Sequence, residues 1–267
     1  MPARVSITSR QNPRVKDAAR LRLGRERQRS GRFIIDGARE IVRAIQAGIK
    51  PCEAYICDQL ASTPEYLRAV EAIEASSPEV FQVTPDVFAK LAFGDRQDGV
   101  VVVAETPRRG THDLEIGARP IVAVIEGLEK PGNVGAILRS ADAAGVDAII
   151  VADGGTDLYN PNSIRASLGT IFRPNVCEAS TAETIDWLRD KSLPIVAARP
   201  DAEKLYTEVN YMSGAAIVLG SEAAGLSHAW RAAGITPVRL PMHGIADSLN
   251  VSTTAAVLFY EALRQRG

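Results

Sequence analysis

The sequence predicts an α/β protein of two domains, with a mostly parallel sheet in the C-terminal one. From residue 121 onward, short apolar runs alternate with helical segments, a pattern typical of parallel strands covered by helices on both faces. A shorter alternation of strands and helices lies between residues 31 and 104. Residues 105–120 hold two prolines and two glycines, so we expect domains over 1–105 and 120–267, joined by a linker over 106–119.

Composition supports folded domains and places positive charge at the N-terminus. The 267 residues are 46% hydrophobic, enough to fill a core in each domain. The net charge is only -1, yet the first 50 residues carry 13 Lys and Arg against 4 Asp and Glu. Such an asymmetry is typical of a segment that faces nucleic acid, although a solvated helix face is the other interpretation.

Cysteines, histidines and hydropathy exclude several classes of protein. The three cysteines form no CxxC pair and the three histidines have no metal-ligand spacing, so we expect a reducing compartment and no metal site. No apolar run approaches the roughly 18 residues of a membrane helix, and the first residues do not start a signal peptide. We therefore expect a soluble cytoplasmic protein with no membrane partner.

The first domain is predicted to open with a basic helix. Asn12 and Pro13 form a helix start, and the helix is expected to run to about Arg29 with Lys16 and Arg20 on one stripe. Further strands are expected over 31–37, 52–57, 79–83 and 100–104, with helices over 38–47, 64–75 and 84–92.

In the second domain, three strands end in polar, glycine-rich turns. Asn133 and Ser248 lie where the caps of the following helices are expected, so each turn alone has a plain interpretation as a helix cap. The expected strands are 121–126, 147–152, 194–198, 215–220 and 236–240, and the expected helices are 133–144, 181–190 and 248–265.

Taken in order, the three turns resemble the three motifs of the SpoU-type RNA 2'-O-ribose methyltransferases of the SPOUT superfamily. The first is Asn133-Val134-Gly135-Ala136 with Arg139, and the second is Leu219-Gly220-Ser221-Glu222 with Gly225. The third is Leu240-Pro241-Met242 followed by Ser248-Leu249-Asn250-Val251-Ser252. The resemblance covers roughly residues 120–265, and the first domain is similar to the ribosomal-protein-like RNA-binding domain that precedes many such enzymes.

The resemblance implies a trefoil-knotted α/β fold, S-adenosylmethionine as cofactor and a ribose 2'-hydroxyl as acceptor. It makes Arg139 the residue at the hydroxyl, held by Asn133, Glu222 and Asn250. The family arginine is sometimes assigned as the base that takes the proton, but a guanidinium holds its own proton at neutral pH. We therefore expect Arg139 to orient the phosphate and hydroxyl of the nucleotide and to stabilise negative charge, whether or not it also relays a proton. The residues expected at the cofactor are Leu219, Gly220, Leu240, Met242, Ser248, Leu249, Asn250 and Ala198, the last of them with Arg199 beside it.

The resemblance also implies RNA contacts and a homodimer paired through the C-terminal domain. Arg165 and Ser167 resemble residues that approach the substrate from the partner subunit. The first domain offers Ser9, Arg10, Lys16, Arg32, Arg39 and Arg96 as further candidates for RNA contact.

Ribosomal RNA, most simply that of the large subunit, is the expected substrate, because the family's tRNA enzymes typically lack the front domain. Antibiotic resistance through such methylation stays open, as does tRNA methylation. A catalytically silent RNA-binding factor for ribosome assembly is an alternative from another class. An unrelated nucleotide-binding enzyme is a third, although the chain has neither a GxGxxG nor a GxxxxGK[ST] motif.

Overall fold

The computed structural model describes residues 4–60, 63–94, 96–232 and 234–267. The chain divides into two compact units. Unit 1 comprises the residues up to 107 together with 159–172, and unit 2 comprises 108–158 and 173–267. Residues 159–172, which lie inside the expected second domain, are therefore part of unit 1.

Unit 1 is built on a five-stranded mixed sheet in the order β1-β4-β3-β5-β2. The pairs of β4 with β1 and β3 are parallel, and those of β5 with β3 and β2 are antiparallel. The strands are β1 (Val5–Ile7), β2 (Arg32–Asp36), β3 (Pro51–Ile56), β4 (Glu79–Val83) and β5 (Val100–Glu105). The helices are α1 (Pro13–Arg20), α2 (Gly24–Ser30), α3 (Ala38–Gln46), α4 (Pro64–Ala75), α5 (Pro85–Leu91) and α7 (Pro161–Ser167).

The expected single helix from Pro13 to about Arg29 is wrong, because the chain breaks it into α1 and α2. Asn12 caps α1 as expected, accepting a hydrogen bond from the backbone of Arg14 at 2.9 Å. After the buried Leu21, the backbone of Leu23 is extended and a second helix begins. The guanidinium of Arg27 donates to the carbonyl of Leu21 at 2.7 Å, so a carbonyl at the break is satisfied by a side chain.

Unit 2 is built on a six-stranded sheet in the order β11-β9-β10-β6-β7-β8, and every pair in it is parallel. The strand β8 was not expected from the sequence. The strands are β6 (Ile121–Glu126), β7 (Ala148–Ala152), β8 (Val176–Ala179), β9 (Ile195–Ala198), β10 (Ala215–Leu219) and β11 (Ile235–Val238). The helices are α6 (Pro131–Ala143), α8 (Thr181–Asp190) and α9 (Val251–Arg266).

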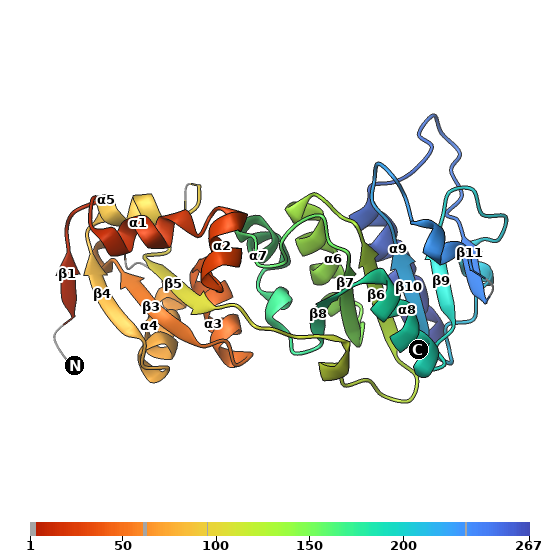
Figure 1. The fold of residues 1–267 in the computed structure, drawn as a ribbon, viewed down its shortest axis with the longest axis horizontal. Coiled ribbons are helices and arrows are strands. Elements are labelled where there is room, and N and C mark those ends of the chain that lie inside the picture. The colour runs from red at the N-terminus through yellow and green to blue at the C-terminus, as the bar shows by residue number, and fades with distance from the viewer. Residues whose placement is uncertain (1–3, 61–62, 95, 233) are drawn as a thin grey trace. The chain divides into compact units, whose positions relative to one another are not determined.

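Both faces of the unit 2 sheet are covered, as expected for continuous apolar strands. Val122 and Val124 of β6 pack in a cluster with Ile185 and Leu188 of α8. All six residues of β6 are buried, so the opposite face of the strand is covered as well. Helices α6 and α9 pack against each other, and α9 also contacts β10 (Figure 1). This two-sided burial fixes the strands, so the loops at their carboxyl ends start from a rigid base.

Strand order determines where a site can form. Successive strands run from β6 outward to β7 and β8, and β10 then lies on the other side of β6. The sheet therefore reverses its direction of winding between β6 and β10, and open parallel sheets bind ligands at the carboxyl ends of strands beside such a point. Among the described residues, no helix has the length and apolar character needed to cross a membrane.

Candidate functional site

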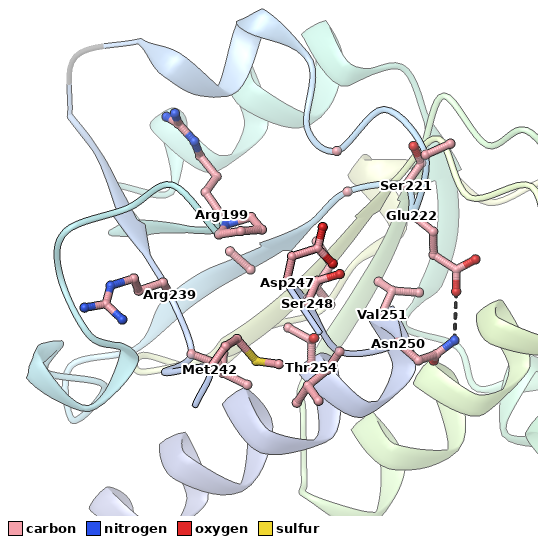
Figure 2. Close-up of a pocket in the computed structure, with 18 of the residues that line it drawn as sticks. Arg199, Ser221, Glu222, Arg239, Met242, Asp247, Ser248, Asn250, Val251 and Thr254 are labelled. Atoms are coloured by element: carbon pink, nitrogen blue, oxygen red, sulfur yellow. Dashed lines mark hydrogen bonds between the residues drawn. The ribbon is translucent and has the colours of Figure 1, made fainter. Parts of the chain in front are cut away.

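Three loops at the carboxyl ends of β9, β10 and β11 line a cavity of about 690 Å³ in unit 2 (Figure 2). The strands are neighbours and parallel, so their carboxyl ends share one edge of the sheet. The structure brings together all the residues expected at the cofactor: Ala198, Leu219, Gly220, Leu240, Met242, Ser248, Leu249 and Asn250.

The loop after β10 is a tight turn that requires glycine at its start. Ser221 and Gly225 exchange two backbone hydrogen bonds, of 3.1 and 3.0 Å, which close the turn. A Cβ atom placed on Gly220 would lie only 2.5 Å from the carbonyl oxygen of Gly225. Backbone cannot move aside as a side chain can, so this position admits no larger residue without opening the turn.

The loop after β11 leads into α9, and Asn250 rather than Ser248 caps the helix. The side chain of Asn250 accepts hydrogen bonds from the backbone and hydroxyl of Ser252, at 2.9 and 2.6 Å. The expected cap at Ser248 is thus two residues too early, since α9 itself begins at Val251. Asp247 and Ser248 lie along the cavity instead (Figure 2).

A polar network joins the first, second and third motifs. The amides of Asn133 and Asn250 both donate to Oε1 of Glu222, at 2.6 and 2.7 Å. Lys130 forms an ion pair with the other carboxylate oxygen of Glu222. The hydrogen bond from Lys130, supported by its charge and by Asn133, holds the pKa of Glu222 below its ordinary value. The carboxylate of Glu222 is therefore charged at neutral pH and ties α6 to both loops.

This network depends on a correction to the first motif. Helix α6 begins at Pro131, with Lys130 at the cap position, so Asn133 lies in the first turn and is not the cap. Its side chain is consequently available to Glu222. No role was predicted for Lys130, although its position directly before Pro131, the first residue of α6, was a visible signal.

Arg139 lies on the same helix as Asn133 but does not line the cavity. Six residues of helix separate the two along the axis by about 9 Å. The side chain of Arg139 is exposed, and no hydrogen bond or ion pair joins it to any residue that the structure describes. In this structure Glu222 holds Lys130 and the two asparagines, and a contact between these residues and Arg139 stays a prediction for the substrate complex.

Two arginines line the cavity in addition to the expected residues. Arg199, noted beside Ala198, makes a two-point ion pair with Asp201, with contacts of 3.0 and 2.6 Å. Arg239 was missed, although it directly precedes the third motif. Figure 2 shows both arginines on one side of the cavity and Glu222 with Asn250 on the other. The cavity thus has a cationic side and a side of amide and carboxylate groups.

The basic residues expected to contact RNA lie mainly beside carboxylates of unit 1. Arg10, Arg32 and Arg39 are exposed, with the nearest carboxylate oxygens 3.3 to 3.7 Å away. Arg96 differs, because its side chain is only 13% exposed and its guanidinium donates to Glu40 at 3.0 Å and to the backbone carbonyl of Asp36 at 2.7 Å. A phosphate would have to displace these partners to reach Arg96.

The segment expected to reach the substrate from a partner subunit forms α7 of unit 1. Arg165 is exposed, and its guanidinium lies 3.5 Å from the carbonyl of Phe93. Ser167 is fully buried; its hydroxyl donates to the carbonyl of Ile164 at 2.8 Å and accepts from the backbone of Gly169 at 3.2 Å. An RNA contact by Ser167 would require this hydroxyl to be uncovered, so the structure gives it the role of ending α7.

Metal ligation finds no support in the part of the chain that the structure describes. Within those residues, no group of three or more His, Cys, Asp and Glu side chains is placed to hold a metal ion.

Comparison with known proteins identifies similar sequences over both units. The profile of the SpoU rRNA Methylase family matches residues 120–260, and that of the MRM3-like substrate binding domain matches residues 12–102. A 23S rRNA (uridine(2479)-2'-O)-methyltransferase of Streptomyces viridochromogenes is 32% identical, over 99% of this chain and 94% of the relative.

Solved structures with the same fold include enzymes of the same kind. An RNA 2'-O ribose methyltransferase crystal structure is 45% identical, with a TM-score of 0.83 over 98% of this chain and 99% of that one. The SpoU methyltransferase AviRb from Streptomyces viridochromogenes, in complex with AdoMet, is 28% identical, with a TM-score of 0.86 over 96% of this chain and 98% of that one.

Proposed function

This chain belongs to the SpoU rRNA methylase family, and from that premise we propose that it methylates a ribose 2'-hydroxyl of large-subunit ribosomal RNA with S-adenosylmethionine. The observation that carries the proposal is that the second and third motif loops line one cavity, while Glu222 of the second accepts hydrogen bonds from Asn133 of the first and Asn250 of the third. These residues lie far apart in the sequence, and the fold brings the three motifs together through their side chains.

The cavity suits a ligand of the size and polarity of S-adenosylmethionine. Its volume of about 690 Å³ falls within the usual range for small-molecule sites, roughly 300 to 1,000 Å³. Backbone groups around Gly220, Leu240 and Leu249 offer donors and acceptors for an adenine and a ribose. We assign Arg199 and Arg239 to the negatively charged carboxylate of the amino acid end.

The chemistry follows from what the side chains can hold in place. When bound, S-adenosylmethionine supplies a methyl group on a positively charged sulfur. Arg139 orients the ribose hydroxyl and its phosphate and stabilises the negative charge that develops on the hydroxyl oxygen as its proton passes to water. The oxygen–carbon bond would replace the carbon–sulfur bond of the donor, which would leave as S-adenosylhomocysteine. Glu222 holds the first turn of α6 against both loops, which fixes the helix that carries Arg139. Alignment of the reacting atoms supplies most of the rate.

The substrate assignment depends on unit 1 and on the similar proteins. A substrate-binding domain profile matches residues 12–102, and the Streptomyces relative methylates 23S rRNA by its name. The basic residues between Arg4 and Arg32 number ten against two acidic ones, which suits phosphate contact. We therefore assign Arg10, Lys16, Arg32 and Arg39 to the RNA, with Arg165 approaching from a partner subunit.

The proposal includes a cytoplasmic homodimer with a trefoil knot in unit 2. Large apolar side chains lie exposed on the third loop and on α9, with Ile245 fully exposed and Leu249, Tyr260 and Leu263 between 39 and 50% exposed. Tyr260 and Leu263 lie three residues apart on α9, so they share one helix face that a second chain could cover. The three cysteines are free, which suits a reducing compartment.

Incubation with methyl-labelled S-adenosylmethionine and total RNA from a strain that lacks the gene tests this function. The expected result is label in large-subunit rRNA at one linkage that resists alkali, since a methylated 2'-oxygen cannot attack the adjacent phosphate. Label in tRNA would favour the tRNA alternative. A protein that binds RNA but not the cofactor would be the silent assembly factor.

A further inference from the structure

Glu126 is a buried carboxylate behind the cavity that no motif of the sequence includes. It is the last residue of β6 and only 6% exposed. Charged groups are rarely buried without partners, because removing a charge from water is costly. No ion pair reaches Glu126 from any residue that the structure describes. Its charge must therefore be satisfied by hydrogen bonds.

Four hydrogen bonds reach the two oxygens of Glu126 from two separate segments. Oε1 accepts from the hydroxyl of Thr181 and from the indole of Trp230, both at 2.8 Å. Ser227 donates twice, from its hydroxyl to Oε1 at 2.8 Å and from its backbone N–H to Oε2 at 2.7 Å. All four partners are donors, so the side chain of Glu126 serves here only as an acceptor, and both of its oxygens are used.

These bonds hold the loop that forms one wall of the cavity. The register of β10 with β6 pairs Leu219 with Ile125, so the loop after β10 starts beside Glu126. Residues 220–225 of that loop line the cavity and include Glu222. Ser227 lies two residues beyond Gly225, where the tight turn closes. Glu126 thus fixes the far end of the loop to the same sheet from which its near end emerges.

We propose that Glu126 is a positioning residue for cofactor binding, which holds the loop of residues 220–227 in its binding geometry through Ser227 and Trp230. The inference rests on the proposed function and adds a residue that touches neither cofactor nor RNA. Without Glu126, the loop keeps its own backbone turn but loses its attachment to β6. Cofactor affinity then falls, because the loop has to be ordered at the moment of binding.

The test compares two buried carboxylates of unit 2. Glu126→Gln keeps the size of the side chain but replaces one carboxylate oxygen by an NH2 group. This group is a donor, and it would face the donors that now bond to Glu126. Glu261→Gln is the matched control, because Glu261 of α9 is 7% exposed and accepts hydrogen bonds from Arg264 and Gln265. Each protein is titrated with S-adenosylhomocysteine by calorimetry, below its unfolding temperature as measured by circular dichroism.

Glu126→Gln is expected to weaken S-adenosylhomocysteine binding by about tenfold or more, and Glu261→Gln to leave it within about twofold of wild type. In turnover assays, the KM for S-adenosylmethionine rises in Glu126→Gln while the KM for RNA stays that of wild type. A general loss of structure would move both constants. Equal affinity in Glu126→Gln and wild type would overturn the inference.

Milder variants keep the test decisive if Glu126→Gln does not fold. Thr181→Val and Ser227→Ala each remove one hydroxyl donor and are expected to weaken binding by about threefold. Thr181→Ser keeps the hydroxyl and is expected to bind as wild type does. Wild-type affinity in both Thr181→Val and Ser227→Ala would contradict the proposal.

Failure of the proposed function has a different signature. A wild-type protein that does not bind S-adenosylhomocysteine overturns that function and this inference together. A wild-type protein that binds, with a Glu126→Gln variant that binds equally well, overturns the inference alone.

Discussion

The arginines proposed to act on RNA have different surroundings in the two units. Arg10, Arg32 and Arg39 of unit 1 lie near carboxylates on an exposed surface, whereas Arg139 of unit 2 is exposed with no hydrogen bond or ion pair to the described residues. Exposed ion pairs contribute only about 0 to 1 kcal/mol, so those of unit 1 can exchange a carboxylate for a phosphate at little cost. We therefore expect unit 1 to bind RNA through many weak contacts, and we expect a few residues of unit 2 to carry most of the catalytic effect. Single substitutions should have large effects in unit 2 and small ones in unit 1.

Arg139→Lys tests the unit 2 side of this comparison with the largest expected effect. Lysine keeps the charge but loses the planar fork of donors, so we expect kcat to fall by about 10²- to 10³-fold with unchanged affinity for S-adenosylhomocysteine. Arg189→Lys, another exposed helical arginine of unit 2, is the control and should keep wild-type turnover. Near-normal turnover of Arg139→Lys would show that a point charge suffices and that the fork of donors has no special role.

Glu222→Gln tests whether the hydrogen bonds and the ion pair of Glu222 are needed for catalysis in unit 2. Glutamine retains one acceptor for the two asparagines but cannot pair with Lys130. We expect methylation rates about tenfold below wild type at saturating substrates, since α6 is held less firmly against the loops. Single-turnover rates with bound RNA measure this directly. If Lys130→Met kept the wild-type rate while Glu222→Gln fell tenfold, the ion pair would be irrelevant and the amide contacts alone would matter.

Arg239→Gln sharpens the assignment of the cavity's cationic side. If Arg239 binds the cofactor carboxylate, affinity for S-adenosylhomocysteine should fall about fivefold. Affinity for 5'-methylthioadenosine, which has no carboxylate, should not change. Calorimetry with the two ligands separates these cases. If the affinities for both ligands were unchanged and the KM for RNA rose, Arg239 would instead bind an RNA phosphate.

Lys16→Gln tests the unit 1 side, where a small effect is expected. Because this lysine would supply one phosphate interaction among many, its removal should weaken RNA binding about threefold and lower the slope of log affinity against log salt by about 0.7 to 0.9. Filter binding over a series of salt concentrations gives both quantities. A loss of a hundredfold or more from this one lysine would contradict the picture of dispersed weak contacts.

The pH dependence of stability gives the smallest expected effect. The pKa of Glu222 is lowered in the folded protein by Lys130, so the stabilisation it provides is complete above its ordinary value of 4.5 and is lost as the pH falls through the lower folded value. The unfolding temperature of wild type should exceed that of Glu222→Gln by a constant few degrees or less between pH 6 and 8. The difference should shrink below about pH 4.5. A difference that grows on acidification would have the wrong sign.

The sequence predicted the cavity better than the details around it. Ala198, Gly220 and Leu240 lie at the carboxyl ends of β9, β10 and β11, which proved parallel and consecutive in the sheet, and such strand ends share one edge. Helix starts were less predictable, because capping preferences are similar for neighbouring polar residues. The sequence therefore predicts a cap at Ser248, whereas Asn250 caps the helix in the structure.

Features that depend on tertiary partners were not accessible from the sequence. Nothing local shows that residues 159–172 join unit 1, that Ser167 is buried, or that the donors to Glu126 come from two distant segments. The paired state of Arg96 is of the same kind, because Glu40 lies 56 residues away in the chain. The sequence shows that Arg96 is charged, but it does not show that Glu40 is its partner in the fold.

The central claim is that the ends of β9, β10 and β11 hold the methyl donor with its sulfur directed toward the helix that carries Arg139. A crystal structure of the complex with S-adenosylhomocysteine tests this most directly. The account predicts the adenine and ribose against the backbone of Leu219, Leu240 and Leu249, with the sulfur on the side of Glu222 and α6. A ligand bound elsewhere, or one whose sulfur points away from α6, would contradict it.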